Sequence, residues 1–238
     1  MSTATGAAGG PSAVTDWAAF IAQNTRLLPP PLVPEIRLHL AEESLPIWRR
    51  TEEQLGEINV PPPYWAFAWA GGQALARYLL DNPALVRAKA VLDLGTGSGL
   101  TAIAAMRAGA ARTLAADIDQ VALAAVALNA GANGVTVATT AADLLAGPPD
   151  AGFAVVLVGD LFYERQLAER VDRFIMAAAQ GGAHILIGDP GRSYFPKGRF
   201  DKVADYRVPV TRELEDTEIK QTAVWQIAAA GRPPASSL

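Results

Sequence analysis

The chain has 238 residues, half of them hydrophobic, and a net charge of −4 at pH 7. This length suits one domain with a sizeable core, and no apolar run is long enough to span a membrane. The absence of cysteine excludes disulfides, thiolate metal sites and a cysteine nucleophile. With only two histidines, no metal site is predicted, and the negative charge gives no general attraction to nucleic acid or to an anionic membrane.

The N-terminal quarter differs in composition from the rest of the chain. Residues 1–13 are mostly Ala, Gly, Ser and Thr and are predicted to form a disordered tail. Residues 14–60 carry short helical patterns broken by prolines, including a predicted helix from Glu35 to about Glu43 that follows a proline. Three consecutive prolines at 61–63 indicate the entry to a main domain over residues 61–230. A helix is predicted over 72–81, where Asn82-Pro83 ends it.

From residue 89 onward, strand and helix patterns alternate along the chain. Such alternation predicts an α/β fold with a doubly wound, mostly parallel sheet. Two further strand patterns, joined by an acidic turn, add an antiparallel C-terminal hairpin and bring the sheet to seven strands. The predicted strands are 89–94, 112–116, 135–138, 153–158, 183–188, 202–212 and 219–229, and the helices between them are 99–108, 119–131 and 164–179.

A glycine-rich turn follows the first predicted sheet strand. Apolar residues from Val91 run into Gly95-Thr96-Gly97-Ser98-Gly99, a pattern typical of a buried strand that ends in a nucleotide-binding turn. The dinucleotide fingerprint would place its third glycine at position 100, which is leucine. Asp93 stands two residues before the first glycine. This arrangement is typical of enzymes that bind S-adenosylmethionine (SAM), whose cationic methionine end suits a carboxylate.

The next two strands also end in carboxylates, where ligands of open α/β sheets bind. Asp117 lies 22 residues after Gly95, and we predict that it accepts hydrogen bonds from the ribose hydroxyls. Asp119 is predicted mainly to cap the following helix. Asp143 follows the third strand and is placed to meet the adenine amino group, although a solvated loop acid is an equally good interpretation.

Acids and aromatics gather after the fourth strand, in the segment from Asp160 to Glu164. A carboxylate orients an amine, and an aromatic face stabilises a methylated ammonium group. We therefore predict that Asp160, Tyr163 and Glu164 act on a cationic acceptor. The structural alternative is that Phe162 belongs to the core and that Glu164 only begins a helix.

Two further segments are candidates for the same cleft. Trp69, followed by Gly71 and Gly72, is predicted to cover the methionine end of the ligand, where glycines allow close approach; a purely structural role for these aromatics is the alternative. After the fifth strand, Asp189 and Arg192 are expected at the rim of the cleft, although Pro190-Gly191 alone would explain a turn.

Taken together, these segments resemble the seven-β-strand lysine methyltransferases, and within them the family that methylates the electron transfer flavoprotein β-subunit. The similarity covers roughly residues 30–228 and departs at Gln120, where family members usually have proline. It implies a class I, Rossmann-like SAM-dependent methyltransferase that releases S-adenosylhomocysteine, with Ile118 joining the cofactor site. The matching segments are 63–66, 69–75, 77–83, 91–95, 117–119, 159–163 and 186–192.

Other functions stay open at this point. A ribosomal protein L11 methyltransferase shares the core but usually carries an Asn-Pro-Pro-type motif where this chain has Asp160-Leu161-Phe162-Tyr163. A small-molecule methyltransferase and a non-catalytic SAM-binding protein are further alternatives. The first 25 residues contain no Lys or Arg, and the composition is rich in Ala and Arg and poor in Lys, so we expect a bacterial, cytoplasmic protein.

Overall fold

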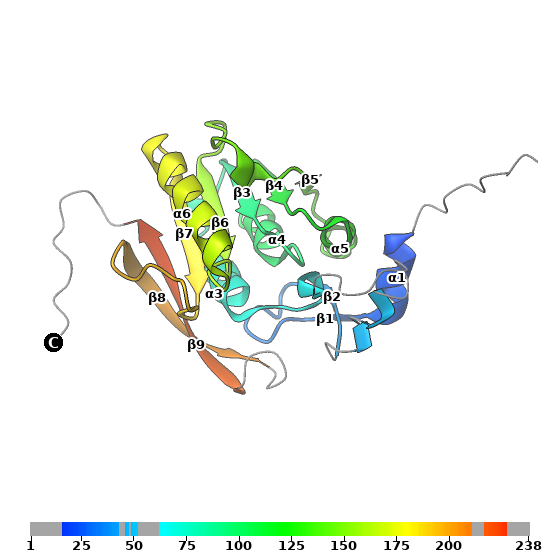
Figure 1. Cartoon of the computed structure of the whole chain (residues 1–238). Helices are drawn as coiled ribbons and strands as arrows, with labels where there is room; N and C mark the ends of the chain where they lie inside the picture. The colour runs from blue at the N-terminus through cyan, green and yellow to red at the C-terminus, as the bar shows by residue number, and fades with distance from the viewer. Residues whose placement is uncertain (1–15, 43–45, 48, 52–61, 211–216, 228–238) are drawn as a thin grey trace, which may run out of the picture.

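A computed structural model of the chain describes residues 16–42, 46–47, 49–51, 62–210 and 217–227 (Figure 1). The predicted tail over 1–13 and the predicted domain limits at 61 and 230 lie outside these residues. Within the described part, no helix has both the length and the apolar character needed to cross a membrane.

The centre of the fold is a seven-stranded sheet in the order β5-β4-β3-β6-β7-β9-β8. The strands β3 to β7 run parallel, and β9 and β8 add two antiparallel strands at one edge (Figure 1). The predicted fold class is therefore confirmed. The strands span β3 Ala90–Leu94, β4 Arg112–Ala116, β5 Ala138–Thr140, β6 Val155–Gly159, β7 His184–Asp189, β8 Phe200–Pro209 and β9 Ile219–Ile227.

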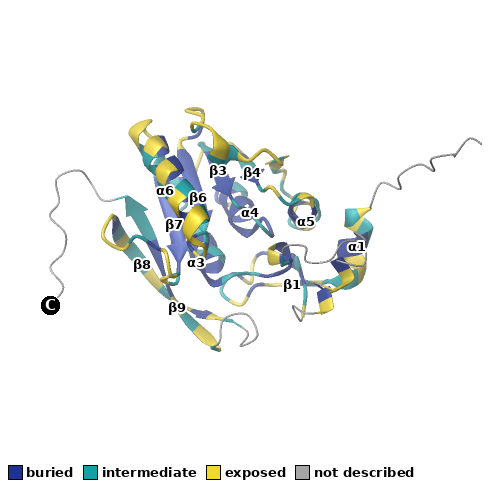
Figure 2. Cartoon of the chain, viewed as in Figure 1, coloured by how far each residue is buried: buried dark blue, intermediate teal, exposed yellow. Residues whose placement is uncertain are grey.

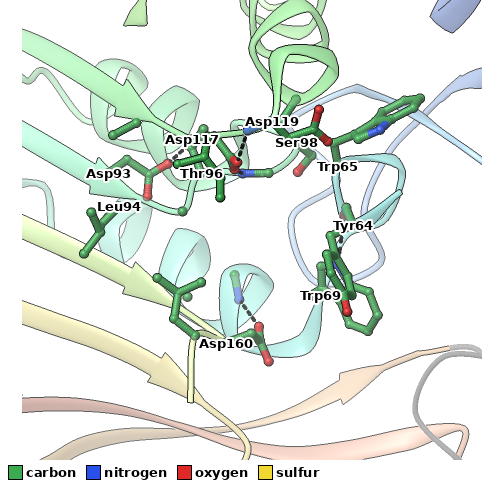
Figure 3. Close-up of a pocket in the computed structure, with 18 of the residues that line it drawn as sticks. Tyr64, Trp65, Trp69, Asp93, Leu94, Thr96, Ser98, Asp117, Asp119 and Asp160 are labelled. Carbon is green, nitrogen blue, oxygen red and sulfur yellow. Dashed lines mark hydrogen bonds between the residues drawn. The ribbon is translucent and has the colours of Figure 1, made fainter. Parts of the chain in front are cut away.

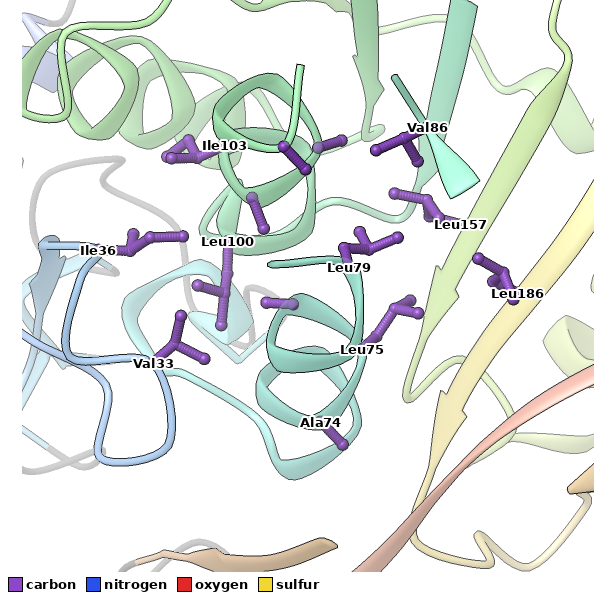
Figure 4. Close-up of a cluster of buried hydrophobic side chains, with 14 of the residues drawn as sticks. Val33, Ile36, Ala74, Leu75, Leu79, Val86, Leu100, Ile103, Leu157 and Leu186 are labelled. Atoms are coloured by element: carbon purple, nitrogen blue, oxygen red, sulfur yellow. The ribbon is translucent and has the colours of Figure 1, made fainter. Parts of the chain in front are cut away.

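Helices cover both faces of this sheet, because successive residues of a buried parallel strand point to opposite sides. Leu157 and Leu186 pack against α3 (Ala70–Asp81) on one face, where α4 (Leu100–Arg107) lies beside α3 (Figure 4). Their neighbours Val156 and Ile185 pack against α6 (Arg165–Gln180) on the other face. The central strands are accordingly buried, whereas α6 exposes its outer side (Figure 2). The helix α5 (Gln120–Ala132) packs beside α4 and β4.

The segment before the sheet is not wholly helical. It contains α1 (Trp17–Asn24), but the predicted helix from Glu35 to Glu43 is wrong, because Leu38–Leu40 forms the strand β2, paired with β1 (Arg26–Leu28). The tertiary contacts explain the difference. Asn129 of α5 accepts a hydrogen bond from the His39 amide at 2.7 Å, which holds this backbone extended. Leu38 and Leu40 are buried while His39 between them is half-buried, the alternation of a strand.

Other elements agree with the sequence to within a few residues. The largest difference is the third parallel strand, predicted over 135–138 and found at Ala138–Thr140. This strand is short, lies at the sheet edge and is mostly exposed, so hydrophobic periodicity marks it weakly. The acidic turn of the C-terminal hairpin falls largely within 211–216, outside the described residues.

Candidate functional site

The glycine-rich turn is fixed by the buried carboxylate of Asp93. Its Oδ1 accepts a hydrogen bond from the Thr101 hydroxyl at 2.6 Å, and its Oδ2 accepts from the Thr96 hydroxyl at 2.5 Å and the Ala102 amide at 3.1 Å. Burial raises the pKa of Asp93 to about 6, against these hydrogen bonds, which lower it. All three glycines of the turn, Gly95, Gly97 and Gly99, have positive φ, which other residues rarely adopt. Asp93 thus holds a backbone shape, and its predicted contact with the ligand stays a prediction.

Asp117 lies at the end of β4 and closes the same turn. Its Oδ2 accepts from the Gly97 amide at 2.9 Å, and its Oδ1 accepts from the Asp119 amide at 3.0 Å. Burial raises the pKa of Asp117 despite these bonds. A carboxylate offers about four lone-pair sites, so capacity remains for two hydroxyl donors. Asp119 caps α5 by accepting from the Val121 amide at 2.8 Å, the role expected for it.

These groups line a cavity of about 1200 Å³ at the carboxyl ends of the parallel strands (Figure 3). Among the residues predicted to bind the cofactor or act on the acceptor, three do not line it: Gly71, Gly99 and Glu164. The other predicted residues meet there although they come from segments far apart in the sequence. They are Trp69, Gly72, Asp93, Gly95, Thr96, Gly97, Asp117, Ile118, Asp143, Asp160 and Tyr163.

Asp160 occupies the opposite wall of the cavity, just after β6. It is buried and has a φ of 58°, a strained conformation for a residue other than glycine, of the kind that concentrates at functional sites. Its Oδ2 accepts from the Gly72 amide at 3.0 Å, in the first turn of α3. Its Oδ1 forms an ion pair with Arg192, whose Nη2 lies at 2.6 Å. The helix N-terminus and the guanidinium both stabilise the charged form of this carboxylate.

The two glycines at the start of α3 do different things. A Cβ on Gly71 would lie 2.2 Å from the Gly188 carbonyl oxygen and 2.5 Å from Asp160 Oδ2, so Gly71 permits α3 to pack on the strand ends. A Cβ on Gly72 would meet nothing within 4 Å, and Gly72 lines the cavity. Both glycines were expected to let a ligand approach closely. Gly71 instead lets other parts of the protein approach, whereas Gly72 faces open space.

Three aromatic rings stand together at the mouth of the cavity. The Tyr64 ring centroid lies 5.9 Å from that of Trp69 and 5.6 Å from that of Tyr163. The Trp69 indole nitrogen donates to the Tyr64 carbonyl oxygen at 2.9 Å (Figure 3). Burial raises the pKa of Tyr163 to about 12, so its phenol stays protonated. Tyr64 is not among the site residues predicted from the sequence. Its position in the aromatic segment 64–69 is the signal that could have identified it.

The remaining candidates lie at the periphery. Asp143 lines the cavity, pairs with Arg170 of α6 at 2.6 Å and accepts from the Leu145 amide, and its predicted contact with the adenine stays a prediction. Arg192 lines the cavity as expected, but Asp189 is fully buried behind it and does not reach the rim. Asp189 instead accepts hydrogen bonds from the amides of Gly191 and Arg192 and so shapes the turn that carries Arg192.

Comparisons with known proteins agree with this geometry. A model of the ribosomal protein L11 methyltransferase (PrmA) family matches residues 74–188. The electron transfer flavoprotein β-subunit lysine methyltransferases of Mus musculus and Xenopus laevis are 37% and 38% identical to the chain. Each match covers 87% of this chain and more than four fifths of the relative, 82% and 85% respectively. Magnesium protoporphyrin IX methyltransferase from Synechocystis PCC 6803 superimposes with a TM-score of 0.50 at 14% identity, over 78% of this chain and 93% of that one.

The strand order, the glycine turn and the cavity at the strand ends define a class I methyltransferase fold. The L11 methyltransferase model covers the shared core of this fold but less than half of the chain. The two animal relatives match nearly the whole chain. The chain belongs to the electron transfer flavoprotein β-subunit lysine methyltransferase family.

The same comparison corrects one expectation. The prediction of a bacterial, cytoplasmic protein is contradicted, because the relatives that share the family are animal proteins, from mouse and frog to human and nematode. That prediction depended on an Ala- and Arg-rich composition and on an N-terminus without basic residues. Neither feature identifies the source of the chain, whereas the family match depends on residues throughout the fold.

Proposed function

We propose that the chain transfers methyl groups from SAM to lysine side chains of a folded protein, the electron transfer flavoprotein β-subunit. The observation that carries this proposal is the pairing of two unlike walls in one cavity. One wall has the glycine turn and Asp117, which suit an adenosine. The other wall has Asp160 and exposed aromatic rings, which suit a cationic side chain. The family names supply the identity of the acceptor protein.

The residues present fit SAM. Asp117 keeps lone pairs for two ribose hydroxyls beside the bonds it makes to Gly97 and Asp119. Gly72 leaves space on the cavity wall where a side chain would intrude. The cavity volume of about 1200 Å³ exceeds the range of about 300–1,000 Å³ usual for one small ligand, which leaves room for an entering lysine side chain.

SAM, when bound, supplies a methyl group that is activated by its sulfonium. The lysine nitrogen lone pair forms the new bond to the methyl carbon as the carbon–sulfur bond breaks, and sulfur keeps the electron pair in S-adenosylhomocysteine. The proton lost from the amine goes to water. The chain needs neither a nucleophile of its own nor a metal for this step, so positioning the amine is its main task.

The amine must be neutral to react. For a free lysine with a pKa of about 10.4, deprotonation at pH 7 costs roughly 4.6 kcal/mol. Desolvation at the cavity mouth and the positive sulfonium both lower this cost. Asp160 is held rigidly enough to orient the amine. Tyr163 and Tyr64 line the approach as neutral phenols, because burial raises the pKa of both.

Two measurements on the purified chain test this proposal. Calorimetric titration should show binding of SAM and no binding of NAD. Mass spectrometry of purified electron transfer flavoprotein, after incubation with enzyme and SAM, should show methyl groups on lysines of its β-subunit. Incubation with the Asp160→Asn variant is the control. Labelling of another protein or of a small molecule, with none on the flavoprotein, would keep the SAM site but contradict the proposed substrate.

A further inference from the structure

Asp160 forms an ion pair with the guanidinium of Arg192. Both nitrogens that Arg192 directs at it contact the same carboxylate oxygen, with Nε 3.0 Å and Nη2 2.6 Å from Oδ1. The other oxygen accepts from the Gly72 amide. The side chains of Asp160 and Arg192 are only 10% and 18% exposed, so water screens this pair weakly.

Contacts to both the backbone and the guanidinium hold Arg192 in place. Asp189 Oδ1 accepts from the amides of Gly191 and Arg192 at 2.6 and 2.7 Å, which sets the turn after β7. The guanidinium carbon lies 5.8 Å from the centre of the Trp69 ring, a cation–π distance. Asp160 pairs with the guanidinium from the end of β6. An arginine stays charged at every accessible pH, so this site contains a permanent positive charge.

The ion pair between Arg192 and Asp160 matters because a carboxylate has two opposing effects on the acceptor amine. A carboxylate beside an amine orients it, but an unpaired carboxylate also stabilises the protonated amine, which cannot react. We propose that Arg192 is a positioning residue that neutralises Asp160, so that the cavity orients the acceptor lysine without favouring its unreactive ammonium form. This inference rests on the proposed lysine methyl transfer and assigns to Arg192 a role in it.

The other charged groups described near Asp160 do not provide a second positive charge that could neutralise it. Arg170, the second guanidinium among the described lining residues, is paired with Asp143. Tyr64 and Tyr163 are neutral phenols. The carboxylates nearby only add negative charge: those of Glu164 and Asp117 raise the pKa of Tyr163, and Asp160 raises the pKa of Asp189. Among the described residues, the charge balance at the acceptor position therefore depends on Arg192.

The test is the pH dependence of methyl transfer in a single turnover, with SAM already bound and the flavoprotein saturating. In the wild type, the rate should rise with pH as the bound lysine loses its proton. In Arg192→Met, Asp160 loses the cation that Arg192 provides, so its negative charge should move this rise to higher pH by about 1 unit. Arg192→Lys keeps the charge and should keep the wild-type midpoint even as its maximal rate falls. In the double variant Asp160→Asn/Arg192→Met, the midpoint should return to the wild-type value.

Controls separate charge at this site from other effects. Arg165→Met removes an exposed guanidinium that stacks on the Tyr194 ring and does not line the cavity, and it should leave the midpoint unchanged. Burial raises the pKa of Asp189 to about 7, so the comparison is repeated with Asp189→Asn in both enzymes. Arg192→Gln provides a second neutral variant should Arg192→Met fail to fold, as judged by circular dichroism.

Each outcome decides the inference. A midpoint that moves in both neutral variants and not in Arg192→Lys supports it. Neutral variants with the wild-type midpoint overturn it. Loss of SAM affinity in Arg192→Met with an unmoved midpoint also overturns it and assigns Arg192 to the ligand. Failure of the wild type to methylate any lysine would overturn the proposed function, and it would be seen before any variant is compared.

Discussion

The two walls of the cavity are built in different ways. On the glycine-turn side, Asp93 bonds to Thr96 and Thr101, three and eight residues away in the sequence. On the acceptor side, Asp160 bonds to Gly72 and Arg192, which are 88 and 32 residues away. The first wall is thus encoded almost locally, and the second is assembled only when helices and strands pack. A local motif can mark a ligand site in sequence, whereas an assembled wall depends on the fold.

The two walls also differ in the kind of group that they present. The glycine-turn wall is organised around the buried carboxylate of Asp93, which is 1% exposed, whereas Tyr64 and Tyr163 of the acceptor wall are 40% and 43% exposed. A turn organised in this way suits a small ligand that is bound whole. An open aromatic wall suits a side chain that enters from another protein. The comparison assigns SAM affinity to one wall and methyl transfer to the other, and variants can separate these two functions.

The sharpest test of this division is Asp160→Asn. Asparagine tolerates the positive φ of this position and can still accept from the Gly72 amide, but it lacks the charge that pairs with Arg192. Loss of one preorganised electrostatic group should lower the methyl-transfer rate by about 100-fold or more. SAM affinity, measured by calorimetry, should stay close to that of the wild type. Asp205→Asn, at an exposed acid on β8, is the matched control; a wild-type rate in Asp160→Asn would remove Asp160 from the acceptor site.

Asp117→Ala should show the opposite pattern. Hydrogen bonds to a charged acceptor contribute about 1.5–3 kcal/mol each at most, so each bond lost should weaken SAM binding by about 10- to 100-fold at most. The transfer rate at saturating SAM should fall much less than in Asp160→Asn. Calorimetry and single-turnover rates measure the two quantities separately. Unchanged SAM affinity would count against the ribose assignment.

The adjacent glycines of α3 test how the acceptor wall is assembled. Gly71→Ala forces a Cβ against the Gly188 carbonyl oxygen and Asp160, and overpacking of this kind costs about 1–3 kcal/mol of unfolding free energy. Gly72→Ala has open space around its Cβ and should be neutral, or more stable by about 0.5–1 kcal/mol from helix propensity. Urea unfolding of the pair measures both. Equal stabilities would show that α3 does not need Gly71 to reach the strand ends.

A further prediction concerns pH. Burial raises the pKa of Asp189 from 3.8 to about 7 in the folded state, so the folded protein holds this proton more tightly than the unfolded chain. The resulting stabilisation is full below about pH 4 and is lost as the pH rises to about 7. The Asp189→Asn variant should lack this contribution, so its unfolding free energy should change less than that of the wild type between about pH 5 and about pH 8. Urea unfolding of both proteins at the two pH values checks this. Identical changes in the unfolding free energy of the wild type and the variant would show that another group than Asp189 causes the pH dependence.

The sequence predicted the sheet and the glycine-turn wall well, because their signals are local. The apolar run at 155–158 indicated a strand buried on both faces, and the strand ends located Asp117 and Asp160. The sequence-based prediction failed where contacts between distant parts of the chain determine the local structure. The strand at Leu38–Leu40 depends on Asn129, which lies 90 residues away from His39. Nothing local shows that Gly71 faces Gly188 and Asp160, or that Arg192 pairs with Asp160.

A crystal structure with S-adenosylhomocysteine would test the two-wall account most directly. The account predicts ribose hydroxyls within about 2.5–3.2 Å of the Asp117 carboxylate oxygens. It also predicts that the sulfur points toward the space bounded by Asp160, Tyr64 and Tyr163. A ligand whose ribose lies away from Asp117, or whose sulfur points away from Asp160, would contradict the account.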